Sequence, residues 1–222
     1  MLNLFSIFDP STNLLYFLNW MSSMLSMVLF PQIYWFFASR LTLLLNILFL
    51  SLWSEFYLIF KNKFNMNNMV YLMGLFIFIF FNNFMGLFPY IFTSTSHLVF
   101  SLSFSLTMWF ALMIFGWSLN TNFMFTHLVP MGTPFMLIFF MVLIELLSSL
   151  IRPLTLSIRL VANMVAGHLL ITLMGNFISN FLYLYYFIII FQMLLLILEF
   201  MVSLIQAYVF TILMVLYFKD TN

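Results

Sequence analysis

Residues 134–174 read PFMLIFFMVLIELLSSLIRPLTLSIRLVANMVAGHLLITLM and form one almost uninterrupted apolar run. At a rise of about 1.5 Å per residue, a helix of roughly 40 residues is about 60 Å long, whereas the hydrocarbon core of a membrane is only about 30 Å thick. Pro153, the one proline inside the run, would kink a membrane helix more readily than end it. We therefore predict one long helix rather than two short passes.

Residues 180–218 form a second run of the same kind, which contains neither glycine nor proline and so carries no turn signal. We predict a second long helix, joined to the first by a short turn at residues 175–179. To cross about 30 Å with about 60 Å of helix, each must tilt by about 60° from the membrane normal. Because the usual range is roughly 0–40°, both helices are predicted to be unusually tilted.

The composition of the whole chain places it in a membrane. Of its 222 residues, 66% are hydrophobic and only 5% are charged, against roughly 25% charged residues in soluble domains. So few charges cannot cover a surface in water, and a lipid bilayer is the expected solvent. With no cysteine and three scattered histidines, we expect no metal, no haem and no other cofactor. The net charge of +1 gives no reason to expect a nucleic-acid partner.

Four shorter apolar segments complete a predicted all-α integral membrane protein of about six helices. The segment at residues 41–60 is flanked by Arg40, Lys61 and Lys63 and contains Glu55, which favours a helix lying along the membrane interface. The single membrane domain covers residues 1–222, and its shorter segments are residues 12–37, 41–60, 69–88 and 97–119.

The connections carry helix signals of their own. Residues 93–96 (TSTS) offer N-cap oxygens to the helix at 97–119. A polar loop that holds His127 follows, and Thr133 with Pro134 then gives an N-cap and a proline at the first helical position.

Basic residues predict the orientation. Arg40, Lys61, Lys63 and Lys219 share one side if the 41–60 helix lies on the surface, and the positive-inside rule makes that side the matrix or cytoplasm. The N-terminus, with Asp9, then faces outward. It lacks the features of a secretory signal or an Arg-rich presequence, and the 33 Phe and 19 Met indicate the biased codons of an organelle genome.

Charged residues recur at seven-residue intervals on the first long helix. Glu145, Arg152 and Arg159 fall within one face at about 100° per residue. Glu145 and Arg152 are about 10 Å apart along the axis, too far for an ordinary i,i+4 ion pair. We interpret Arg152 as a structural residue, paired with a carboxylate or with a lipid headgroup.

The second long helix carries a matching polar stripe with Gln192, Glu199 and Gln206, again seven residues apart. Two interpretations are open. The two arginines and two glutamates could pair internally and hold the tilted helices together. Ionisable groups inside a membrane are by default a functional hypothesis, so the stripes could instead carry chemistry.

The surroundings of Arg159 favour a functional site. Ala162 and Ala166 flank Arg159 and Asn163, and small residues four apart let another helix come close. This pattern predicts a face turned toward a partner, with packing inside the chain as the alternative. His168 lies about 180° round the helix from Arg159, either as a proton relay or as an ordinary core histidine.

Four stretches together resemble subunit a of the F-type ATP synthase in its animal mitochondrial form. They are FNNFMGLFPYIFTSTSHL at 81–98, THLVPMGTP at 126–134, IRPLTLSIRLVANMVAGHL at 151–169 and LEFMVSLIQAYVF at 198–210. The resemblance covers nearly the whole chain, and its IRLxANxxAGH block is highly specific.

The resemblance implies roles for single residues. Arg159 matches the arginine that faces the ring of c subunits, and Ala162, Asn163 and Ala166 share its face. His168 and Glu199 match the pair lining the half-channel from the intermembrane space.

Gln206 matches a glutamine near that arginine, and Glu145 and Asp220 match acidic residues of the matrix-side half-channel.

The resemblance also implies a setting. The chain would be a proton-conducting stator subunit of the mitochondrial inner membrane, with its N-terminus in the intermembrane space and its C-terminus in the matrix. Its partners would be the c-ring, peripheral-stalk and small membrane subunits, lipid and protons. With no GxxxxGK[ST] phosphate loop, it would not make ATP itself.

Two other function classes fit less well. A proton-coupled secondary transporter would normally show two repeated halves with broken helices, and the chain has neither. A structural subunit of a respiratory complex would use the polar stripes only to hold helices together, so that losing either arginine would impair assembly alone.

Overall fold

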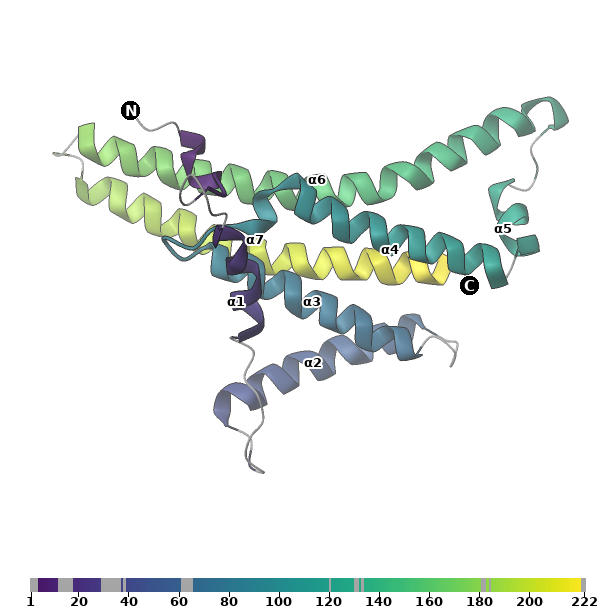
Figure 1. Cartoon of the computed structure of the whole chain (residues 1–222), viewed down its shortest axis with the longest axis horizontal. Coiled ribbons are helices and arrows are strands. Elements are labelled where there is room, and N and C mark those ends of the chain that lie inside the picture. Colours follow the sequence, from purple (N-terminus) through teal and green to yellow (C-terminus); the bar gives the residue numbers. More distant parts are fainter. Residues whose placement is uncertain are drawn as a thin grey trace.

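The structure is a computed structural model, and it describes residues 4–11, 18–28, 37, 39–60, 66–119, 121–129, 132, 134–180, 183 and 185–220. All regular elements among these residues are helices (Figure 1). Five of the helices are long and apolar enough to cross a membrane. The chain is therefore an all-α membrane protein, as predicted. The five are α2 (Arg40–Ile59), α3 (Met66–Gly86), α4 (Leu98–Leu119), α6 (Ile138–Asn180) and α7 (Tyr185–Asp220).

The two long helices dominate the molecule. α6 has 43 residues and α7 has 36, and each is continuous, so the prediction of two long helices rather than four short passes is confirmed. Pro153 lies inside α6 without ending it. Figure 1 shows the two helices side by side near the C-terminal end of α6, and farther apart at the other end, where α4 packs against α6. The tilt of the pair in the membrane stays a prediction.

The predicted turn at residues 175–179 was wrong. α6 continues through Gly175 to Asn180, and α7 begins at Tyr185. The connection therefore lies about five residues later than glycine suggested. Glycine is common inside membrane helices, and Gly175 is exposed with nothing within 4 Å of a Cβ built on it, so it weakens the helix without ending it.

Helix α2 matches the predicted segment at 41–60. Ser39 caps it, because its Oγ accepts a hydrogen bond from the Thr42 N–H at 3.4 Å. Tyr208 of α7 donates a hydrogen bond from its hydroxyl to Glu55 Oε2 at 2.9 Å. α2 is long and apolar enough to span a membrane, so its predicted interfacial position stays a prediction.

The first predicted segment, residues 12–37, is only partly within the described residues. Its described part forms a 3-10 turn, η2 (Leu18–Met21), and the short helix α1 (Ser22–Val28). α1 packs against α3. The remainder of that prediction, apart from Phe37, lies outside the described residues.

The predicted capping run forms a turn of its own. Ser94–Ser96 make the buried 3-10 turn η4, in which Thr93 Oγ1 donates to Ser96 Oγ at 3.0 Å and Ser96 Oγ donates to the Thr93 carbonyl at 2.7 Å. The Thr93 and Ser96 hydroxyls thus form hydrogen bonds within their own turn. α4 begins one residue after His97.

The predicted loop after α4 contains a helix. α5 (Thr121–Leu128) places His127 in its last turn, so the prediction of a loop position for His127 was wrong. Pro134 precedes the 3-10 turn η5 (Phe135–Leu137) rather than occupying the first turn of α6, and Thr133 lies outside the described residues.

The apolar core lies between α2, α3 and α7, and α4 and α6 each contribute two buried residues to it. Its fully buried side chains include Phe56, Leu72, Ile79, Met214 and Val215. α6 instead leaves large apolar side chains exposed, such as Phe139 at 78%. This long uncovered surface must meet lipid or a partner.

Candidate functional site

One face of α6 carries the polar and small residues around Arg159, and it is uncovered. Arg159, Ala162, Asn163 and Ala166 are all exposed. The opposite face of the same helix is packed against the rest of the chain, and its buried residues are Leu156, Ser157, Leu160 and Met164. The exposure contradicts packing within this chain, and it leaves the face open to a partner or to lipid.

Arg159 has no intramolecular ion pair within the described part of the chain. The one salt bridge found there joins Arg152 to Glu145. Of the two arginines and two glutamates that could pair internally, only Arg152 and Glu145 form an ion pair among the described residues. An arginine costs about 2.5–3.5 kcal/mol at mid-membrane on insertion scales, so Arg159 needs a counter-charge from another source.

Glu199 of α7 is buried against α6. Its side chain is 8% exposed, and neither carboxylate oxygen has a hydrogen-bond partner among the described residues. The contact is possible because residue 167 is glycine: a Cβ there would lie 2.8 Å from Glu199 Oε1. Gly167 therefore creates the space that the carboxylate occupies.

His168 follows that glycine and lines a large cavity. Its Nε2 is buried without a hydrogen-bond partner in the described structure, and its ring packs edge-on against Phe8 at a centroid distance of 6.4 Å. Phe8 belongs to the N-terminal 3-10 turn η1 (Leu4–Phe8). We name this space of about 740 Å³ the His168 cavity; its polar lining also includes Asp9, Asn19, Thr93, Thr172 and Gln192.

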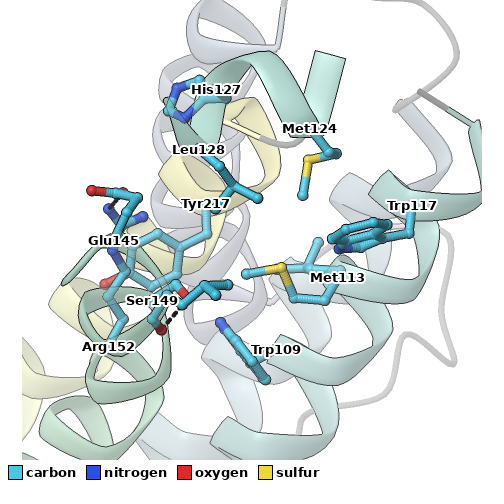
Figure 2. Close-up of a pocket in the computed structure, with 12 residues that line it drawn as sticks. Trp109, Met113, Trp117, Met124, His127, Leu128, Glu145, Ser149, Arg152 and Tyr217 are labelled. Atoms are coloured by element: carbon cyan, nitrogen blue, oxygen red, sulfur yellow. Dashed lines mark hydrogen bonds and ion pairs between the residues drawn. The ribbon is translucent and has the colours of Figure 1, made fainter. Parts of the chain in front are cut away.

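A second cavity, with a mostly apolar lining that includes a charged pair, lies near the opposite end of the long helices. Arg152 Nη2 is 3.8 Å from Glu145 Oε1, and the guanidinium carbon is 5.4 Å from the centre of the Tyr217 ring on α7. Figure 2 shows Glu145, Ser149 and Arg152 along one wall of a space of about 90 Å³, which we name the Arg152 cavity. Its remaining lining is Trp109, Leu112, Met113, Trp117, Met124, His127, Leu128, Leu146 and Tyr217.

The spacing argument against a Glu145–Arg152 pair was wrong, and the interpretation of Arg152 as paired with a carboxylate is confirmed. Residues seven apart are two turns from each other, but side chains on a helix lean toward its N-terminus. The long arginine side chain therefore reaches back along the helix to the carboxylate.

The chain matches known proteins over almost its whole length. The sequence pattern of the family described as ATP synthase A chain matches residues 20–219. The chain belongs to the ATP synthase A chain family. It is similar to ATP synthase subunit a of Locusta migratoria, with 56% identity over 99% of both chains, and of Drosophila melanogaster, with 48% identity over 100% of both. ATP synthase subunit a of Aedes aegypti is 46% identical, again over 100% of both.

In this ATP synthase A chain, the predicted site residues fall in separate places. His168 and Glu199 come together, since Glu199 packs on the glycine beside His168. Arg159 lies on the uncovered face, and Glu145 lies in the Arg152 cavity. Gln206 is half-buried on α7, and Asp220 is the last residue of α7, with its side chain outside the described part.

Three residues at these sites were missed by sequence reasoning. Gly167 was quoted only as part of a motif, and nothing in the sequence distinguished it from Gly175, which has no close neighbour in the same helix. Phe8 and Tyr217 carried no signal, because each meets its partner only through the fold.

Proposed function

We propose that this chain is the proton-conducting stator subunit of the membrane sector of an F-type ATP synthase. In this proposal, two offset half-channels pass protons to and from the carboxylates of a ring of c subunits. The observation that carries it is the order of sites along α6: Glu145, the uncovered Arg159, then His168. At about 1.5 Å per residue, the two flanking sites lie about 21 Å and about 14 Å from Arg159 along the axis.

The His168 cavity would form the inlet from the intermembrane space. Water in a cavity of about 740 Å³ could bring protons to the imidazole. Glu199, buried beside Gly167, would take the proton onward to the ring. A histidine can exchange protons near neutral pH, which suits it to this relay.

Arg159 would separate the two half-channels. Arginine does not deprotonate in proteins, so it cannot carry the proton itself. Its fixed positive charge would hold a ring carboxylate in its ionised form and repel protons that could leak directly between the half-channels. A ring carboxylate must be neutralised before it moves into lipid, because burying it as a charge is costly. Asn163, Ala162 and Ala166 would complete the ring-facing surface.

The outlet to the matrix would run past Glu145 and Asp220, with Gln206 near the arginine. The membrane potential supplies about 2.3 kcal/mol per charge per 100 mV, which ring rotation would transmit to ATP synthesis elsewhere in the complex. The chain would not catalyse that synthesis. Its other partners would be peripheral-stalk and small membrane subunits.

The proposed location is the mitochondrial inner membrane, with the N-terminus in the intermembrane space and the C-terminus in the matrix. The fold supports this orientation. Phe60, directly before the basic segment at 61–63, packs against Phe218 at 5.9 Å, beside Lys219. The end of α7 that carries Lys219 therefore lies beside the C-terminal end of α2, and the positive-inside rule would assign this end to the matrix.

The test is ATP-driven proton pumping by membranes that carry Arg159→Gln, with Arg40→Gln as the matched control. Arg40 is an exposed arginine at the start of α2, away from both cavities. We expect Arg159→Gln to abolish pumping in an assembled complex and Arg40→Gln to retain it. Continued pumping by assembled Arg159→Gln complexes would mean that the arginine is structural and that the proposal is wrong.

A further inference from the structure

Arg152 has no part in the proton path outlined above, yet it lines the same cavity as the proposed outlet residue Glu145. Its side chain and that of Glu145 are each 39% exposed, and both line the Arg152 cavity (Figure 2). The other titratable side chains that line this cavity are His127 of α5 and Tyr217 of α7. Among the described residues of this wall, Arg152 is thus the only fixed charge beside the proposed outlet carboxylate.

The guanidinium group bridges the two long helices. One edge lies 3.8 Å from Glu145 on α6, and its carbon lies 5.4 Å from the Tyr217 ring centre on α7. A planar guanidinium can pair with a carboxylate while its face rests on an aromatic ring. Arg152 is followed by Pro153, which removes one backbone hydrogen bond from α6. The bridge therefore supports α6 at a weakened position.

Stability alone does not explain this arrangement. A half-exposed ion pair at 3.8 Å is longer than a hydrogen bond, and pairs of this kind contribute little to folding. An arginine in a membrane helix is costly, so such a weak pair is a poor way to hold two helices together. What the pair does fix is the direction of the Glu145 carboxylate.

We propose that Arg152 is a positioning residue for the outlet: its guanidinium, supported by the Tyr217 ring, holds the Glu145 carboxylate on the wall of the Arg152 cavity. There the carboxylate can accept a proton from the ring side and release it to matrix water. This inference rests on the proposed outlet role of Glu145. Arg152 itself keeps its charge throughout.

Arg152→Gln and Arg152→Lys in the complete complex test the proposal, with Arg40→Gln as the control for losing an arginine. We expect Arg152→Gln to lower ATP-driven proton pumping per assembled complex about fivefold, the size of a partly exposed ion pair. Arg152→Lys keeps a positive charge within reach of Glu145 and should recover at least half of the wild-type rate. Equal losses in both variants would overturn the proposal, because a positioning charge must be rescued by lysine.

A double variant shows whether Arg152 acts through Glu145. If it does, Glu145→Gln with Arg152→Gln should pump no more slowly than Glu145→Gln alone. Losses that multiply would contradict the proposal. Tyr217→Leu removes the supporting ring and should lower pumping more than Tyr217→Phe, which keeps it.

Arg159→Gln in the same assay separates this inference from the proposed function. If Arg159→Gln abolishes pumping and Arg152→Gln equals wild type, only the role of Arg152 is wrong. If Arg159→Gln still pumps, the proton path itself is wrong, and the inference falls with it.

Discussion

The His168 cavity and the Arg152 cavity treat ionisable groups in opposite ways. Around the first, His168 Nε2 and both Glu199 oxygens are buried with no hydrogen-bond partner in the described structure. In the second, Glu145 is 39% exposed and lies beside a guanidinium. The ionisable groups at the first cavity are therefore buried without partners, whereas those at the second form an ion pair.

This difference suits two steps of one transport cycle. A buried carboxyl group with no counter-charge is costly as an anion, so it suits a group that hands a proton to a ring carboxylate. A half-exposed carboxylate held beside an arginine on a cavity wall remains accessible, so it suits a group that returns protons to water. The comparison predicts that the His168 end is sensitive to packing and the Arg152 end to charge.

Filling the space beside Glu199 should have the largest effect. A Cβ on Gly167 would lie 2.8 Å from the carboxylate, so Gly167→Leu must displace it, and overpacking of this kind typically costs 1–3 kcal/mol. Because the displaced group is the carboxyl group itself, we expect the upper end of this range, a fall in proton pumping per assembled complex of about 150-fold. Gly175→Leu is the control, because nothing lies within 4 Å of a Cβ at that position of the same helix. Similar losses in both variants would show that the effect is on the helix and not on the carboxylate.

Removing the charge of the buried carboxyl group should come next. Glu199→Gln keeps the shape but cannot release a proton, and we expect pumping to fall about a hundredfold, as for the loss of a positioned acid. Glu55→Gln is the matched control, since Glu55 is an exposed carboxylate bound by Tyr208, away from both cavities. Wild-type pumping by Glu199→Gln would remove this residue from the proton path.

Removing the aromatic wall of the His168 cavity should have a smaller effect. Phe8→Ala deletes the edge-on contact with the imidazole, which typically contributes about 0.5–1.5 kcal/mol, so pumping should fall about threefold. Phe5→Ala is the control, because Phe5 lies in the same 3-10 turn and is 62% exposed. If the two variants behave alike, the N-terminal turn does not hold His168.

The smallest expected effect is one on stability alone. Tyr208→Phe removes the hydrogen bond to Glu55 between α2 and α7, with an expected cost of about 1 kcal/mol. The apparent melting temperature of the complex in detergent should fall by about 2–4 °C, while pumping stays at the wild-type rate. A loss of pumping without a loss of stability would extend the functional region to α2.

Much of the fold could be predicted from the sequence, because it depends on segment length. A membrane of fixed thickness makes a run of roughly 40 apolar residues informative by itself, and α6 and α7 follow from it. Gly175 wrongly indicated the turn between the two long helices, since a membrane helix tolerates glycine and α6 continues through it.

The sequence predicted which residues of the candidate site share a face of α6, but not which residues come into contact. Spacing placed Arg159, Ala162 and Ala166 on one face, and that face is exposed. Spacing could not show that Glu199 occupies the space beside Gly167, because two helices must pack before the two residues meet. It also misjudged Glu145 and Arg152, since axial distance ignores the direction in which side chains lean.

We propose that two aqueous half-channels reach opposite ends of α6 and are separated at Arg159. The chain contains no cysteine, so single cysteines at Gln192 in the His168 cavity and at Ser149 in the Arg152 cavity are clean reporters. The decisive measurement is their labelling by a membrane-impermeant thiol reagent added to one side of the membrane at a time. We predict that Gln192→Cys reacts only from the intermembrane-space side and Ser149→Cys only from the matrix side. Reaction of both cysteines from the same side would contradict the account.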